Sequence, residues 1–445
     1  MATLYCGPSN TGNGSGSNFS NLLALPNTTG FTRGNTYVIV DGPYSSRTLS
    51  TPASGSNLIT IRKAGPEDSG VTGYSTALHD GQATIPGTLT ISSNYWLLDG
   101  NNPLGRLTPW VPIRDTNAYG IKVTMNATDG RNIDYHPYTN ITLKNIHSYN
   151  AQQGGPSYNG SHRNTYGLDS SYTKYQDCWI QNSFQDGMVL QNTDYLLIER
   201  CVLEGLGLLQ SGPPDNHGQA LQMSGVSNVV IRWNLIVDNE GQGILAFSDG
   251  CSTIRVYGNV IWNEHTSGGY YTGANQAVWD HYTSTIANTY NYNNTFVNWG
   301  GSYPGLASPN GIFATHSGGS LSGTNVIYNT LFYGVQYQSS AGGIPEGYYA
   351  YGSSTTPGGS NNQSGLTSAI FQNYAGSDFR LTGHTTPGLN MSAQGWWNAG
   401  AHAFFGQLDY NTDMYGTARS TWDRGAFEFA AGGTPPTGTI TLSVR

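Results

Sequence analysis

The sequence is short of charge and of lysine, and both shortages narrow what the protein can do. Charged residues make up only 10% of the 445 residues, and Lys+Arg is 18 against Asp+Glu 26, which gives a formal net charge of −8. Nucleic-acid binders normally carry a basic patch, and none is visible in the sequence. Lysine occurs only at Lys63, Lys122, Lys144 and Lys174, so no polybasic membrane anchor is present. We therefore expect no nucleic-acid partner.

Long apolar runs and cysteine pairs are missing as well. No apolar stretch approaches the roughly 20 residues that a helix needs to cross a bilayer, so we expect no membrane insertion. The four cysteines are too few for a disulfide scaffold, and none forms a CxxC zinc pair. The start, Met1 to Tyr5, lacks the basic and apolar regions of a signal peptide. This leaves two alternatives open: a removed signal peptide, or a protein that never used one, such as a phage structural protein.

What is present is glycine, tyrosine and regularly spaced apolar residues. Glycine accounts for 60 residues and tyrosine for 30, while hydrophobic residues reach 37%. Short Val/Ile/Leu runs bounded by turn residues are typical of β-strands, and helical periodicity is absent. The composition favours a packed, β-rich chain over a disordered one.

One pattern recurs between about residues 140 and 335: an apolar residue, two or three polar ones, then Asn or Cys followed by apolar residues. The intervals between the recurring Asn or Cys residues are 33, 23, 33, 25, 35 and 35, by subtraction of their positions, which are Asn145, Cys178, Cys201, Asn234, Asn259, Asn294 and Asn329. Short intervals suit one solenoid coil of three strands, and long intervals suit the same coil with an inserted loop. A small polar residue at the same turn of each coil predicts a stacked side-chain ladder. For Cys178 and Cys201 we expect two stacked, buried thiols in that ladder.

A second strand keeps a parallel register. The residues predicted to point inward are Leu168, Met188, Leu221, Ile244, Val278 and Ile312, with Gln219, Gln242 and Gln276 stacking beside them. Together the two registers predict an all-β chain: a right-handed parallel β-helix solenoid with an N-terminal cap and a C-terminal closing segment. The predicted division is an N-terminal cap and first strands (1–60), the β-helix (61–340), C-terminal coils and closing segment (341–430), and a linker with a terminal strand (431–445).

These segments resemble the pectate-lyase-like superfamily of right-handed parallel β-helix proteins. The resemblance rests on Leu4 to Gly7, Arg33 to Tyr37 and Asp41 to Tyr44 at the opening, and on Asp413 to Gly416, Arg419 and Asp423 to Glu428 at the close. It implies a carbohydrate-related setting but no particular activity, because this fold hosts lyases, hydrolases, epimerases, adhesins and phage tailspikes. The polygalacturonase pattern is missing, since Asn216-His217-Gly218 lacks its acidic partners, and no acidic calcium cluster with a following arginine is identified.

The long intervals place extra residues after the ladder strand and before the second strand, at about 150–165, 206–217, 264–275 and 299–309. Insertions at one corner of successive coils should wall a groove, and repeat insertions on one face often mark the binding face. Carboxylates or histidines there could act as acids, bases or nucleophiles, and the candidates are Glu240, Glu264, Asp280, His217 and His281. Sugar rings stack on aromatics and hydroxyls bind polar groups, so the candidate substrate-binding residues are Asp215, His265, Tyr270, Tyr271, Trp279, Trp299 and Tyr303.

Two functional hypotheses remain. The first is a non-catalytic glycan-binding or structural β-helix of a virion or cell surface, such as a phage tail protein or adhesin. The second is a polysaccharide lyase or glycoside hydrolase that acts on an extracellular polysaccharide. Binding requires no cofactor, whereas a lyase would use Ca²⁺ to neutralise a uronate. The expected partner is a polysaccharide or surface glycan, the expected location is extracellular, cell-surface or virion, and the terminal strand is a candidate for assembly into homo-oligomers or virions.

Overall fold

A computed structural model of residues 1–445 describes most of the chain. The described residues are 1–101, 114, 116–126, 130–151, 162–183, 186–206, 219–239, 244–247, 250–262, 279–282, 285–298, 313–315, 320–335, 346–347, 349–352, 360–375, 378–394, 401–407 and 412–429. In these ranges the chain has strands and short 3₁₀ turns but no α-helix, and no helix there is long and apolar enough to cross a membrane.

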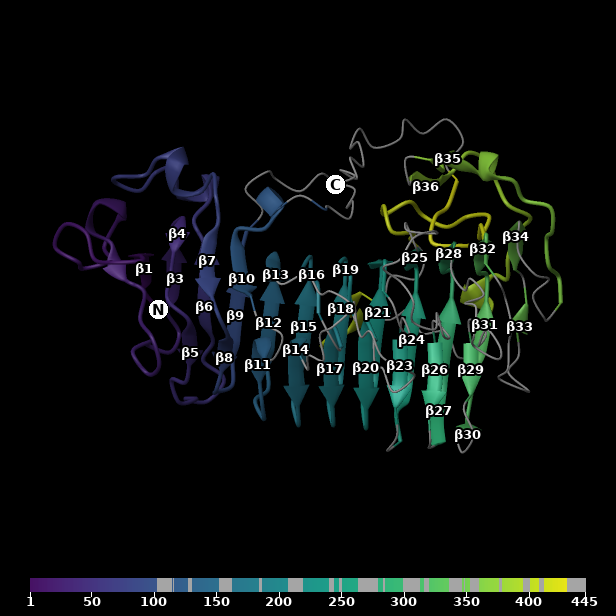
Figure 1. The fold of residues 1–445 in the computed structure, drawn as a ribbon, viewed down its shortest axis with the longest axis horizontal. Helices are drawn as coiled ribbons and strands as arrows, with labels where there is room; N and C mark the ends of the chain where they lie inside the picture. Colours follow the sequence, from purple (N-terminus) through teal and green to yellow (C-terminus); the bar gives the residue numbers. More distant parts are fainter. Residues whose placement is uncertain are drawn as a thin grey trace.

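Three long parallel sheets run side by side along the described chain, and we name them A, B and C (Figure 1). The chain passes from a strand of sheet A to one of sheet C, then to one of sheet B, and then returns to sheet A one coil further on. Through the middle of the molecule each strand pairs in parallel with the strand of the same sheet on the next coil, as β12 pairs with β15 and β15 with β18 in sheet A. This is the architecture of a parallel β-helix, and it confirms the predicted fold class.

The strands of sheet A are β2 (Leu23–Ala24), β1 (Thr3–Gly7), β3 (Thr36–Ile39), β6 (Ile59–Lys63), β9 (Trp96–Asp99), β12 (Ile141–Lys144), β15 (Thr173–Gln176), β18 (Asp194–Glu199), β21 (Ser227–Arg232), β24 (Ser252–Tyr257), β27 (Thr285–Tyr292), β30 (Ser320–Ser322), β31 (Val326–Tyr328) and β33 (Glu346–Gly347). Those of sheet B are β5 (Arg47–Leu49), β8 (Leu89–Ile91), β11 (Arg131–Tyr135), β14 (Arg163–Leu168), β17 (Met188–Gln191), β20 (Leu221–Ser224), β23 (Ile244–Phe247), β26 (Trp279–Tyr282) and β29 (Phe313–Thr315).

Sheet C contains β4 (Gly42–Pro43), β7 (Ala83–Pro86), β10 (Ile121–Met125), β13 (Ile146–Asn150), β16 (Trp179–Gln181), β19 (Val202–Glu204), β22 (Leu235–Val237), β25 (Val260–Trp262), β28 (Thr295–Val297), β32 (Leu331–Tyr333) and β34 (Ala350–Gly352). Two antiparallel pairs follow, β35 (Phe371–Asn373) with β36 (Asp378–Leu381) and β37 (Ala401–His402) with β38 (Gly406–Gln407). The 3₁₀ turns are Phe19–Asn21, Pro66–Asp68, Thr76–Leu78, Thr116–Ala118, Ser368–Ile370 and Met391–Ala393.

The predicted ladder lies at the turn from sheet A to sheet C, and its centre is as expected. The amide nitrogen of Asn234 donates to Oδ1 of Asn259 at 3.0 Å, and that of Asn259 donates to Oδ1 of Asn294 at 3.0 Å. The backbone N–H of Cys201 donates to Oδ1 of Asn234 at 2.8 Å. Cys178 and Cys201 are both fully buried, and burial raises the pKa of the Cys201 thiol. The ladder therefore satisfies buried backbone groups as well as its own amides.

The two outermost members of the predicted ladder are wrong by one residue. Strand register places Ile146 opposite Cys178, and Thr330 opposite Asn294, so Asn145 and Asn329 each precede the ladder position. Both asparagines have a positive φ, 53° and 54°. They belong to the neighbouring left-handed turn position, which is occupied in successive coils by Asn145, Asp177, Arg200, Trp233, Gly258, Asn293 and Asn329. Asparagine suits both positions, because it tolerates the left-handed conformation and also pairs its amide.

The second predicted register holds at its centre and slips at its ends. Met188, Leu221 and Ile244 are paired in register, and all three are buried in the core. Leu168 is wrong, because Thr165 is the residue paired with Met188. Val278 and Ile312 lie outside the described residues, and the residues that continue this column after Ile244 are Trp279 and Phe313. The register was predicted from the spacing of residues in the sequence, and connections of unequal length make that spacing irregular at the two ends.

The long connections occur where they were predicted, between strands of sheet C and strands of sheet B. The gaps after β13, β19, β25 and β28 are long, whereas from β12 onward the turns from sheet A to sheet C take only a residue or two. These four long connections therefore lie at the same corner of the helix, and the earlier connections from β6 to β7 and from β9 to β10 are long at the corner between sheets A and C.

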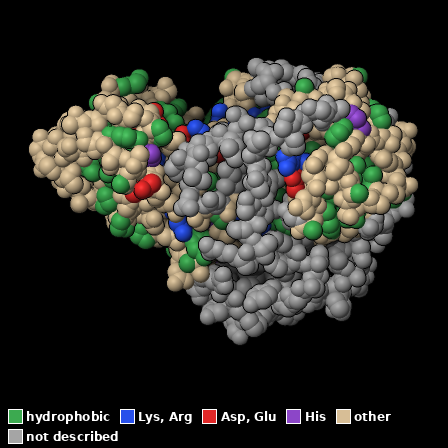
Figure 2. Space-filling view, turned by 90° about the horizontal axis from the view of Figure 1, so that it is seen from above, with side chains coloured by type: hydrophobic (Ala, Val, Ile, Leu, Met, Phe, Trp, Pro, Cys, Tyr) green, Lys and Arg blue, Asp and Glu red, His purple; other side chains and the backbone are tan. Residues whose placement is uncertain are grey.

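The closing segment, residues 366–429, packs on the outer faces of sheets A and C, above the coils in Figure 1. Phe371, Phe379 and Phe427 join a buried cluster with residues of sheet C, including Leu235 and Val260. Seen from the side of this segment, the described surface carries few charged side chains among apolar and neutral ones (Figure 2). Outward apolar side chains of sheet C are thus covered by the chain's own C-terminal part.

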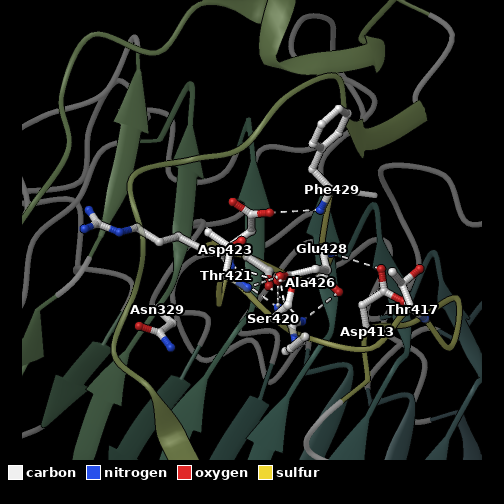
Figure 3. Close-up of polar contacts among 12 residues, drawn as sticks. Asn329, Asp413, Thr417, Ser420, Thr421, Asp423, Ala426, Glu428 and Phe429 are labelled. Carbon is white, nitrogen blue, oxygen red and sulfur yellow. Dashed lines mark hydrogen bonds and ion pairs between the residues drawn. The ribbon is translucent and has the colours of Figure 1, made fainter. Parts of the chain in front are cut away.

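Three buried acids hold the closing segment together (Figure 3). Asp423 accepts from the backbone N–H groups of Thr385 at 2.7 Å and Phe429 at 2.9 Å, and it contacts Nδ1 of His384 at 2.8 Å. Glu428 accepts from the N–H groups of Ser420, Thr421 and Asp423, and Asp413 accepts from those of Tyr415, Thr417 and Glu428. The residues that carried the family resemblance at the C-terminus are therefore structural.

Candidate functional site

Most of the predicted site residues lie outside the described part of the chain: Glu240, Glu264, His217, Asp215, His265, Tyr270, Tyr271, Trp299 and Tyr303. The backbone of Trp279, Asp280 and His281 is described in β26. Asp280 is in register with Leu245, whose other neighbour in the sheet is Gln222, and His281 is in register with Ala246, whose other neighbour is Met223. The roles assigned to these residues stay predictions.

A different group of polar side chains comes together on sheet B, at the corner that receives the long connections. It consists of Arg131 and Asp134 in β11, Arg163 and Tyr166 in β14, and Asp186 two residues before β17. We call these five residues the arginine–tyrosine cluster. Arg131 is paired in register with Arg163, and Asp134 with Tyr166, so adjacent coils supply matching positions.

The side chains of the cluster form a continuous chain of contacts. The guanidinium carbon of Arg131 lies 3.6 Å from the centre of the Tyr166 ring, and its Nη1 is 2.9 Å from Oδ2 of Asp134. The guanidinium of Arg163 lies 5.7 Å from the same ring, and its Nε is 3.3 Å from Oδ2 of Asp186. The side chains of Arg131, Asp134 and Arg163 are 33%, 27% and 29% exposed, so a ligand can reach them.

Buried asparagines fix the strands that carry the two arginines. Asn164 is fully buried, and its amide donates to the backbone oxygens of Ser148, Gln181 and Asn182. Asn132 is also fully buried and contacts Nε2 of His162 at 2.9 Å. Each asparagine directly follows the arginine of its coil, so these hydrogen bonds fix the backbone next to Arg131 and Arg163.

The described side chains that follow the cluster in the same register column are buried. Val189 and Gln222 follow Tyr166 in this column and are only 1% and 8% exposed. Arg131, Asp134 and Arg163 are therefore more accessible than the two described side chains that follow Tyr166 in this column.

Asp186 combines burial with an altered acidity. Its side chain is 1% exposed, and burial raises the pKa of this carboxyl to about 7, against the opposing effect of Arg163. One of its carboxyl oxygens, Oδ1, is buried without a hydrogen-bond partner. A carboxyl group that titrates near neutrality can give or take a proton at working pH.

This shift predicts how Asp186→Asn changes stability with pH. The folded pKa is raised above the unfolded value of 3.8, so the stabilising contribution is complete below about pH 4 and is lost as pH rises through about 7. Asparagine resembles the protonated carboxyl, so we expect the variant to be more stable than the wild type by about 1–2 kcal/mol at pH 5 and by about 4 kcal/mol at pH 8. Urea unfolding at the two pH values measures this. A variant that is less stable at pH 8 would show instead that Arg163 keeps the carboxylate charged.

Sequence reasoning missed this site, because the sequence predicts solvated faces for Asp169, Asp186, Lys144 and Arg232. Asp186 and Arg232 are instead buried. Arg232 pairs with Glu199 at 2.6 Å beneath the closing segment, and Arg163 neutralises part of the Asp186 charge. Asp169 is exposed and Lys144 is partly exposed, as expected. The sequence feature that could have indicated the site is the pair Arg131 and Arg163, because each lies two residues before an inward-facing position of its strand.

The described residues contain no group of three or more His, Cys, Asp or Glu side chains that could hold a metal ion. The cluster pairs each of its two carboxylates with a guanidinium, which competes with a cation for the same oxygens. A role for Ca²⁺ stays a prediction that belongs to the lyase alternative.

Comparison with known proteins supports the fold. Residues 166–355 match a family model described as a right handed beta helix region. A pectate lyase, Pel9A, is similar over 96% of both chains at 14% identity, with a TM-score of 0.51. An alginate lyase from Paenibacillus sp. str. FPU-7 (12% identity, 82% of this chain and 95% of that one, TM-score 0.38) and an endo-xylogalacturonan hydrolase from Aspergillus tubingensis (12% identity, 82% and 100%, TM-score 0.29) are more distant. No curated protein matches the sequence. The chain is thus a right-handed parallel β-helix of pectate-lyase-like fold.

Proposed function

We propose that this right-handed parallel β-helix protein binds an extended glycan through the arginine–tyrosine cluster on sheet B, as a glycan-binding or structural protein of a virion or cell surface. The observation that carries the proposal is the Tyr166 ring with two guanidiniums beside it, 3.6 and 5.7 Å from its centre. Assembly through residues 439–444, which lie outside the described residues, is part of the same proposal, as is an extracellular setting.

The geometry suits oxygen-rich ligands. A guanidinium that stacks on an aromatic ring keeps its N–H donors at its edge, where they can bind hydroxyl or carboxylate oxygens in pairs. Arg131 and Arg163 lie on neighbouring coils, about 4.8 Å apart along the helix axis. A sugar residue is about as long as this spacing, so successive sugars can meet successive coils. The polysaccharides named for the similar proteins, pectate and alginate, fit the same kind of extended ligand.

Affinity electrophoresis in native gels that contain single polysaccharides tests the proposal. We expect at least one of polygalacturonate, alginate, xylan and galactomannan to retard the wild type, and we expect Arg163→Ala or Tyr166→Ala to weaken that binding about tenfold or more. Arg255→Ala is the matched control, because Arg255 lies 5.2 Å from the Tyr290 ring on sheet A, away from the cluster. Equal retardation of all variants would show that the glycan, if bound, does not use this face.

One observation favours the second candidate, a polysaccharide lyase or hydrolase. Asp186, with its pKa near 7, adjoins the cluster and could act as a general acid or base on a bound glycan. A reducing-sugar assay combined with ultraviolet absorbance, with and without Ca²⁺, separates the alternatives. Absorbance growth indicates a lyase, reducing ends alone indicate a hydrolase, and neither signal alongside gel retardation leaves a binding protein.

A further inference from the structure

A second aromatic group lies at a different corner of the helix, where sheet B turns into sheet A. Tyr172 and Tyr195 occupy equivalent positions on neighbouring coils, Tyr172 just before β15 and Tyr195 as the second residue of β18. Phe404 and His402 of the closing segment pack against them. We call Tyr172, Tyr195, Phe404 and His402 the corner aromatic group.

The two tyrosine rings form a flat stack. Their centres are 4.8 Å apart and their planes differ by 7°, while Phe404 meets both rings edge-on, at 76° and 70°. Tyr172 is 42% exposed, which makes it one of few large hydrophobic side chains exposed among the described residues. Register places Asn140 on the coil before Tyr172 and Asn228 on the coil after Tyr195, so the column that stacks these rings continues with small amides.

The stack is maintained against a conformational cost. Both tyrosines have a positive φ, 57° and 59°, a region that bulky side chains rarely adopt. Asn140 and Asn228 have the same conformation, with φ of 59° and 53°, and asparagine is the ordinary residue for it. The aromatic side chains at the two central positions are therefore not explained by the backbone of this turn.

The polar groups beside the stack indicate which ligand it would accept. The same corner carries Asp169, which is exposed and contacts the amide of Asn192 at 2.8 Å, and Asp194, which accepts from Ser227 and Asn228. The ammonium of Lys174 lies 4.6 Å from the Phe404 ring centre and is partly desolvated, which lowers the pKa of this lysine. Because the ammonium of Lys174 lies against the Phe404 ring, the exposed charge of this corner is the carboxylate of Asp169, which favours neutral sugars and repels uronates.

From these contacts we infer that Tyr172, backed by Tyr195, is a platform on which a neutral pyranose of a glycan stacks. This contact is separate from the arginine–tyrosine cluster, and it goes beyond the proposed function because it predicts a second sugar site of opposite charge preference. Tyr172 is the more exposed ring of the stack, and the small amide of Asn140 on the preceding coil leaves room beside it for a sugar ring to pack on the aromatic face.

The test compares Tyr172→Asn with Tyr172→Phe in native gels that contain galactomannan or xyloglucan as neutral probes and polygalacturonate as the acidic one. Asparagine suits the left-handed backbone, so the first variant removes the ring without straining the turn, and phenylalanine keeps the ring. We expect a neutral polysaccharide to retard the wild type and Tyr172→Phe equally and to bind Tyr172→Asn about tenfold more weakly. Urea midpoints confirm that all three proteins fold.

Arg163→Ala separates this inference from the proposed function. If Arg163→Ala loses retardation while Tyr172→Asn keeps it on every probe, the platform is overturned and the cluster stands. If Tyr172→Asn loses retardation by the neutral probe and Arg163→Ala keeps the wild-type retardation on every probe, including polygalacturonate, the platform stands and the cluster fails. Absence of retardation of the wild type by both neutral polysaccharides also overturns the platform.

Discussion

Replacing Asn259 with alanine is expected to lower the free energy of unfolding by about 2–4 kcal/mol. Its Oδ1 accepts from both the backbone N–H and the side-chain amide of Asn234, at 2.9 and 3.0 Å, and its own amide donates to the backbone oxygen of Ile231 and to Asn294. Asn259 is fully buried, so water cannot replace these partners. A buried donor left without an acceptor costs about 1–3 kcal/mol, and the substitution strands more than one polar group.

Urea unfolding followed by far-ultraviolet circular dichroism measures this loss. Asn13→Ala is the control, because Asn13 is exposed in the N-terminal loops and its side chain accepts a local hydrogen bond from the N–H of Ser15. We expect the control to change stability by less than about 0.5 kcal/mol. A loss below about 1 kcal/mol for Asn259→Ala would contradict the ladder as a stabilising element of the coils.

Asp423→Ala is expected to be equally severe and to act on the closing segment, with a loss of about 3–5 kcal/mol. The carboxylate is fully buried and accepts from the backbone of Thr385 and Phe429, from the Thr385 hydroxyl and from His384. Its removal leaves two buried backbone donors without a partner. The segment it holds covers apolar residues of sheets A and C, so we expect it to detach before the coils unfold.

Limited proteolysis with mass-spectrometric mapping detects such detachment. In Asp423→Ala we expect cleavage within residues 366–429 under conditions that leave the wild type intact. Glu67→Ala is the matched control, since Glu67 is 50% exposed in a surface pair with Arg62, and surface pairs contribute little. Cleavage that begins in the coils of the variant would show that the segment is not an independently stabilised unit.

The centre of the fold could be predicted from the sequence because coil geometry repeats there. Asn234, Asn259 and Asn294 occupy the same turn of consecutive coils, so their amides stack. At the ends, Asn145 and Asn329 filled the adjacent left-handed turn instead. Asn329 uses its amide to bind Leu389 of the closing segment, a long-range contact that no local spacing reveals.

The candidate site was harder to predict, because its residues are far apart in the sequence and come together only in the folded chain. Arg131 and Tyr166 are 35 positions apart in the printed sequence and meet only through the pairing of β11 with β14. Asp186 looked like one of several exposed acids, and its raised pKa comes from burial that composition does not show. The residues that were predicted lie mainly in the long connections, outside the described part of the chain.

Hydrogen–deuterium exchange in the presence and absence of a polysaccharide that retards the protein tests the central claim most directly. The account predicts that the glycan slows exchange in residues 131–135 and 163–168, the strands of the arginine–tyrosine cluster, and that Arg163→Ala abolishes this protection. Protection elsewhere with no change in these two strands would contradict glycan binding on this face of sheet B.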